Sequence, residues 1–112
     1  MRAIHRDDGE LCGFVRAAEG GWQALTVFGG VLAHAEEEHE AERRVRETGL
    51  ASLADRWTMI DHTTGEEEIV LIQEASPDGV TVAIGYYSLP GVPTRRIERS
   101  DLDTATITLI RH

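Results

Sequence analysis

The sequence predicts an α+β fold with two parts: a β-sheet with one main helix over residues 1–54, and a small antiparallel β unit over residues 55–112. Apolar residues alternate with period two in both parts, which is typical of strands. A central stretch with acids first and arginines last is typical of a helix. The whole chain has 112 residues, about one ordinary domain, so we expect the two parts to share a core.

Strands are expected on both sides of the glycine pair Gly20-Gly21. Residues 11–18 and 22–28 each alternate in polarity, and a glycine pair between two such segments is typical of a hairpin. Residues 3–5 add a short leading strand, separated from the hairpin by a turn. The first part is therefore predicted to begin with three antiparallel strands.

The main helix is predicted over residues 35–48. Glu40 and Arg44, and likewise Glu42 and Arg46, are four positions apart with the acid first, a spacing worth about 0.3 kcal/mol per pair. Gly49 is expected to end the helix in the left-handed conformation. A further short helical turn is expected over residues 50–55.

The second part is predicted to hold five strands. They cover residues 57–61, 68–73, 80–86, 94–99 and 104–110, with a tight turn over 76–79 and one helical turn over 100–103. Five short strands with a helical turn before the last resemble an SH3-like small barrel. This likeness of architecture implies no activity.

The charge of the chain is acidic and concentrated in its middle. There are 20 acidic residues, 11 arginines and no lysine, and the formal net charge is −9. Residues 34–68 hold 11 of the acids against 4 arginines. Such a charge repels nucleic acid and anionic membranes at long range, so neither is the expected partner.

The single cysteine, Cys12, cannot form an intramolecular disulfide, which favours a reducing cytoplasmic setting. The first residues contain no apolar run of the kind found in a secretory signal. The longest apolar run, residues 69–72, is far too short to span a membrane.

No cofactor, metal site or catalytic residue is predicted. His34 and His39 resemble a zinc-peptidase helix, but they are five positions apart, about 140° around a helix, too far for shared coordination. Asp61 and His62 place an acid beside a base, but no nucleophile motif accompanies them, and His62 is interpreted as a turn residue.

One basic and aromatic concentration is present near the end of the chain. It combines arginines and tyrosines, the residue types that small barrels use for single-stranded nucleic acid: Arg95, Arg96, Arg99, Tyr86 and Tyr87. We treat this patch as a candidate binding surface. The alternative is an ordinary solvated strand face.

The leading hypothesis is a non-enzymatic protein-binding or accessory module. The acidic helix, with Glu36, Glu37 and Glu40 as candidate contact residues, would dock on a basic surface and gain association rate by electrostatic steering. Oligomeric state is left open.

Two alternatives come from other classes. One is a nucleic-acid accessory factor, or an acidic imitator of nucleic acid, and the first of these would use the Arg95–Arg99 strand. The other is a ligand binder or enzyme with a pocket between the two parts. The residues to inspect for such a pocket are Trp22, Trp57, Tyr86, His62 and Asp61.

Overall fold

The computed structural model describes residues 1–85 and 91–111, and it confirms the α+β class. The first part of the chain contains four strands and the main helix: β1 (Arg2–His5), β2 (Leu11–Ala18), β3 (Gly21–Leu25), β4 (Val31–Ala35) and α1 (Glu38–Thr48). A short 3-10 helix leads to the rest: η1 (Ala51–Ala54), β5 (Arg56–Asp61), β6 (Glu66–Ser76), β7 (Gly79–Ile84), β8 (Thr94–Glu98), α2 (Arg99–Asp103) and β9 (Ile107–Arg111).

All nine strands belong to one mixed, open sheet with the order β1-β2-β3-β4-β9-β5-β6-β7-β8. Neighbours in that order run antiparallel, except that β4 and β9 are parallel and pair through Val31 and Ile110. This corrects the expectation of a sheet followed by a separate SH3-like barrel, because no separate barrel is shown. The Val31–Ile110 pairing continues the strands of the first part into those of the second.

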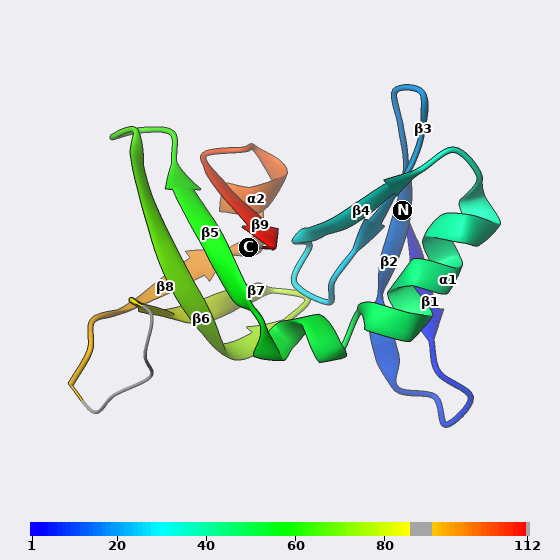
Figure 1. Cartoon of the computed structure of the whole chain (residues 1–112), viewed down its shortest axis with the longest axis horizontal. Helices are drawn as coiled ribbons and strands as arrows, with labels where there is room; N and C mark the ends of the chain where they lie inside the picture. Colours follow the sequence, from blue (N-terminus) through cyan, green and yellow to red (C-terminus); the bar gives the residue numbers. More distant parts are fainter. Residues whose placement is uncertain (86–90, 112) are drawn as a thin grey trace.

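The two groups of strands lie side by side, and α1 with η1 connects them along the lower edge in Figure 1. Each group has its own cluster of buried apolar side chains. The first contains Ile4, Cys12, Val15, Ala24, Ala41 and Val45, and the second contains Phe28, Trp57, Met59, Val70, Val80, Val82, Ile97, Ile107 and Leu109. Leu32 of β4 packs against both clusters, which places β4 between them.

Phe28 comes from the first part of the chain but is buried in the second cluster. Its ring meets the Trp57 ring edge to face, with centroids 5.4 Å apart at 69°. The expected strand over residues 22–28 is therefore too long, since β3 ends at Leu25. The chain turns tightly after β3, where the backbone N–H of Gly30 donates to Thr26 Oγ1 at 2.9 Å, and this turn carries Phe28 into the second cluster.

The main helix begins later than predicted, at Glu38 rather than residue 35. The reason is β4, a strand the sequence did not predict, which takes Ala35 into a pairing with Trp22 of β3. Gly49 also differs from expectation, because its backbone is right-handed, with φ −55 and ψ −55. Glycine is needed there for space, since a Cβ would lie 2.5 Å from the carbonyl oxygens of Cys12 and Val45.

The second part follows the predicted order closely. Its five strands overlap the expected ranges, and α2 is the single helical turn expected before the last strand. The bounds differ in three places: β6 is longer than expected, β7 ends at Ile84 while residue 86 of the expected strand lies outside the described residues, and β9 begins at Ile107 rather than residue 104. The Glu98 and Asp101 side chains form a capping box at the start of α2, which satisfies backbone N–H groups that have no partner within the helix. The turn expected over residues 76–79 joins β6 to β7.

Candidate functional site

The arginines of the predicted basic patch are each paired with an acid. Arg95 Nη1 lies 3.0 Å from Asp61 Oδ2, and Arg96 Nε lies 3.4 Å from Glu98 Oε1. Tyr86 and Tyr87, the aromatic members of the patch, lie outside the described residues. The structure thus supplies each of these cations with an internal counter-charge, which reduces the positive field of β8.

Arg99 is set apart from the other two arginines. Its side chain is only 15% exposed, and Nε lies 3.1 Å from Asp103 Oδ1. Its Nη1 donates to the carbonyl oxygen of Pro77 at 3.3 Å, and its guanidinium carbon lies 5.5 Å from the centre of the Phe14 ring. Arg99 therefore connects β2, the β6–β7 turn and α2, which is a structural arrangement.

Asp61 is held in its charged form by two partners. The backbone N–H of Thr63, at 2.9 Å, and the Arg95 guanidinium hold the pKa of Asp61 below its usual value, the first more strongly. The His62 side chain contacts β9, where its Nε2 lies 2.8 Å from Thr108 Oγ1. Asp61 is the last residue of β5 and His62 begins the turn after it, as predicted for His62, so the two neighbours in sequence have separate partners.

The other residues considered for a pocket also diverge. Trp57 is fully buried in the second cluster, and its indole N–H donates to the Ser52 carbonyl oxygen at 3.0 Å. Trp22 packs against the first cluster. Burial raises the pKa of the Cys12 thiol, which keeps it protonated and unreactive.

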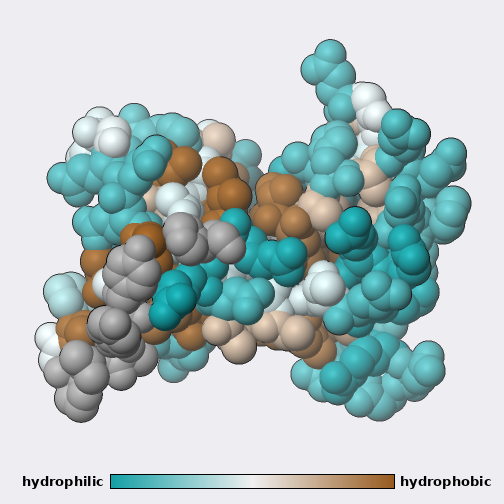
Figure 2. Space-filling view, viewed as in Figure 1, coloured by the Kyte–Doolittle hydropathy of each residue, from teal (hydrophilic) through white to brown (hydrophobic). Residues whose placement is uncertain are grey.

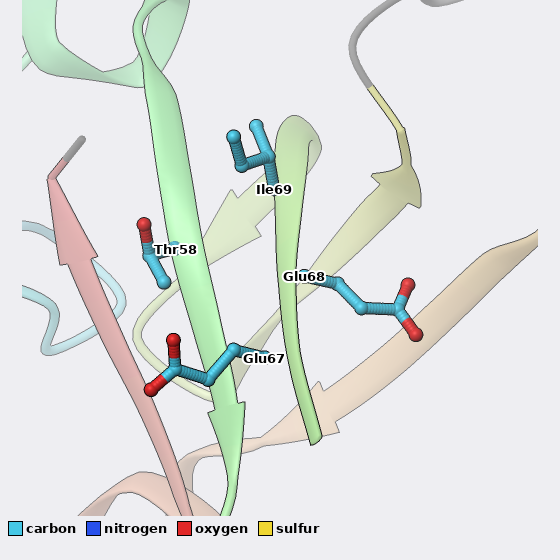
Figure 3. Close-up of a pocket in the computed structure, with 4 residues that line it drawn as sticks. All are labelled: Thr58, Glu67, Glu68 and Ile69. Atoms are coloured by element: carbon cyan, nitrogen blue, oxygen red, sulfur yellow. The ribbon is translucent and has the colours of Figure 1, made fainter.

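Glu67 and Glu68 border a shallow pocket of about 230 Å³ on β5 and β6, together with Thr58 and Ile69. Figure 3 shows the two carboxylates pointing to opposite sides of β6. Paired acid–base chemistry requires two carboxyl groups that face one reacting bond. This pair does not have that geometry.

Metal-ligating residues do not converge within residues 1–85 and 91–111, where no group of three or more His, Cys, Asp or Glu side chains could hold an ion. His34 belongs to β4 and His39 to α1, so the two histidines considered for zinc lie on different elements. In the same part of the chain, no helix is long and apolar enough to cross a membrane.

The acids of α1 divide into a paired and an unpaired set. Arg2 of β1 donates to Glu38 Oε1 and Glu42 Oε2, both at 2.7 Å. Glu42 also pairs with Arg46 at 2.8 Å, as the sequence spacing predicted. The hydrogen bond from Arg2 is the main cause that lowers the pKa of Glu42. The side of α1 near β1 is thus electrically balanced.

Three acids without an ion pair in the described part of the chain gather at the start of α1, and a fourth, Glu47, is exposed near its end. Glu36 and Glu37 lie between β4 and α1, and Glu40 lies in the first turn of the helix. Among the described residues no ion pair involves them, and the expected Glu40–Arg44 pair is not formed.

The β2–β3 turn, which carries Glu19, lies beside this group, because Gly21 at the start of β3 lies against the backbone of Ala35 and Glu36. We call Glu19, Glu36, Glu37 and Glu40 the acidic surface. Chemically, its free carboxylates can accept hydrogen bonds from arginine or lysine side chains of a partner.

Two long-range ion pairs determine which of these charges are compensated, and the sequence did not predict them: Arg2 with the acids of α1, and Arg95 with Asp61. The partners are 36 or 40 positions apart in the first case and 34 in the second. A local spacing rule contains no signal for either.

No protein-family model, no curated protein and no solved structure matches the chain. Any inference about the function of this chain therefore rests on its own sequence and structure.

Proposed function

We propose that this chain is a non-enzymatic protein-binding module that contacts a basic surface of another protein through the acidic surface. The observation that carries the proposal is the separation of charges around α1. Arg2 and Arg46 compensate Glu38 and Glu42, whereas Glu36, Glu37 and Glu40 have no ion pair among the described residues. Most of the charge left over lies at the start of the helix, where Glu36 and Glu37 are exposed and Glu40 is half-buried, and Glu47 adds one exposed acid near its end.

Uncompensated surface charge of this kind attracts an oppositely charged partner before the two proteins touch. Its field steers an oppositely charged partner toward the binding orientation and raises the association rate. The field is screened beyond about 8–10 Å at physiological salt, so contacts of this type weaken as salt is raised. The expected complex is thus salt-sensitive.

Two arginines in the middle of α1 restrict the orientation of the partner. Arg43 and Arg44 are exposed one turn after Glu40 and have no acid partner in the described part of the chain. A partner that places its cations opposite Glu36 and Glu37 keeps them away from these arginines. We therefore expect its basic residues to face the start of the helix and the β2–β3 turn.

An affinity capture from host lysate with nuclease-treated and untreated halves tests the proposal. Three baits are compared: the native chain, a Glu36→Gln, Glu37→Gln, Glu40→Gln variant, and a Glu66→Gln, Glu67→Gln, Glu68→Gln variant. The two variants remove the same charge from different places. The expected result is a protein that survives nuclease, is retained by the second variant and is lost by the first.

Equal loss with both variants would show that only net charge matters and would contradict the assignment of the site. Loss on nuclease treatment would instead favour the nucleic-acid accessory function. That alternative has less support, because Arg95, Arg96 and Arg99 are each paired with an acid. Binding to phosphates gains most of its affinity from free cations.

A further inference from the structure

A groove runs between the two groups of strands on the side where η1 joins them. Its volume is about 340 Å³, at the small end of the ~300–1,000 Å³ typical of ligand pockets. One wall comes from the start of β2 and the turn after β3, and the other comes from η1 and the end of β6. The lining residues are Glu10, Leu11, Val27, Leu50, Leu53, Ala75, Ser76 and Pro77. We call this the seam groove.

The seam groove is apolar and open. Val27 is 7% exposed, whereas Leu11, Leu50 and Leu53 are half-buried. Ala51 and Ala54 of η1 are exposed beside it. Figure 2 shows brown and tan atoms along the middle of the lower edge, next to a right-hand lobe that is mostly teal. A contiguous apolar strip with polar borders is typical of an interaction site.

The border of the seam groove is acidic. Glu10 lines it and shares Arg6 as an ion-pair partner with Asp8, and Asp7 lies in the same turn, so three acids stand against a single arginine. At the opposite wall Asp78 follows Pro77 and has no ion pair among the described residues. Positive charge on an occupant would therefore be attracted from both sides.

We propose that the seam groove binds a cationic amphipathic peptide segment. Leucine-like side chains of the segment occupy the groove, and flanking lysines or arginines contact Glu10 and Asp78. Docking of an apolar stripe in a groove is a common recognition mode for amphipathic helices. A second copy of this chain does not fit, because its own net charge of −9 would bring like charges together.

This site goes beyond the proposed function, because it uses a different surface and apolar contacts. The acidic surface lies at the start of α1, whereas the seam groove lies past its end, at η1. Either proposal can fail while the other stands.

Titration of isotope-labelled protein followed by amide NMR shifts tests the proposal. The probe is a synthetic leucine–lysine peptide with all leucines on one helical face. A peptide of the same composition in scrambled order is the control for charge alone. We expect the amphipathic peptide to shift amides of Leu11, Leu53 and Ala75, and to bind roughly tenfold more tightly than the scrambled peptide.

Pro77→Arg places a bulky cation in the groove, and Pro93→Arg makes the same change at another exposed proline. We expect Pro77→Arg to lower the affinity for the amphipathic peptide roughly tenfold, and Pro93→Arg to leave it unchanged. If Pro77→Arg disturbs the fold, Ala54→Arg serves the same purpose.

Several outcomes would overturn the proposal: no binding, equal binding of both peptides, or shifts centred on Glu36 and Glu40. A dilution-dependent change of the groove amides without peptide would assign the groove to self-association instead.

Discussion

The guanidinium group of Arg99 lies over the ring of Phe14, with its carbon 5.5 Å from the ring centre. Phe14 belongs to β2 of the first strand group, and Arg99 starts α2 in the second. The same arginine pairs with Asp103 and donates to the Pro77 carbonyl oxygen. One side chain thus holds three elements and both strand groups in contact.

Arg99→Ala should lower the free energy of unfolding by about 1–3 kcal/mol. It removes a partly desolvated cation–π contact, worth about 0.5–2 kcal/mol, and hydrogen bonds from a charged group. Urea denaturation measures the change. Arg96→Ala is the matched control, since it breaks only an exposed pair with Glu98, worth about 0–1 kcal/mol. Equal effects of the two changes would refute the linking role of Arg99.

Phe28→Ala should be the more damaging change, with a loss of about 3–5 kcal/mol. Phe28 is fully buried against Trp57 and fixes the turn after β3 to the second cluster. Phe28→Leu keeps most of the apolar volume, so it should remain folded and lose less. Denaturant titration followed by tryptophan fluorescence compares them. A native-like midpoint for Phe28→Ala would mean that the second cluster does not depend on this anchor.

Asp61 makes the fold sensitive to acid. Because its pKa is lower in the folded chain than in the unfolded one, its stabilising contribution is complete above the unfolded value of about 3.9. It is lost as pH falls through the lower folded pKa. Asp61→Asn keeps an acceptor for the Thr63 N–H but cannot carry charge.

Denaturation midpoints between neutral and acid pH check this. We expect the loss of stability below about pH 4 to be shallower in Asp61→Asn than in the native chain. Identical acid profiles would show that the Arg95–Asp61 pair contributes nothing to folding.

Removing a paired acid of α1 should destabilise the fold more than removing the acids that have no ion pair among the described residues. Glu42→Gln breaks contacts with Arg2 and Arg46 and is expected to cost up to about 1 kcal/mol. The Glu36→Gln, Glu37→Gln, Glu40→Gln variant should cost less at high salt, since these residues have no ion pair among the described residues and lose only their interaction with the helix dipole, which salt screens. Thermal melts at low and high salt compare the two. A larger loss in the triple variant would indicate a structural role for the acidic surface.

The strands and α2 of the second part could be predicted because period-two alternation and turn residues are local signals. The β4 strand could not, since Val31–Ala35 is short and runs directly into glutamates that favour a helix start. Once β4 was missed, the start of α1 was placed too early. The pairing of Val31 with Ile110 involves residues distant in sequence, so the continuous sheet was not predictable from either half.

The sequence predicted which residue types make up the candidate site, but it did not predict how these residues are arranged. The run of glutamates marked α1 as acidic, yet only the position of Arg2 beside Glu38 and Glu42 shows which acids are compensated. Likewise, the arginines of β8 and the first residue of α2, Arg99, resembled one patch. Their separation depends on Asp61 and Phe14, which come from other strands.

The measurement that tests the central claim most directly is the affinity of the captured partner for purified protein at low and at high salt. The native chain, the Glu36→Gln, Glu37→Gln, Glu40→Gln variant and the Glu66→Gln, Glu67→Gln, Glu68→Gln variant are compared by calorimetry. We predict that binding weakens roughly tenfold or more in the first variant, with a reduced salt dependence, and stays near native in the second. Salt-independent binding that is unchanged by the first variant would contradict the account.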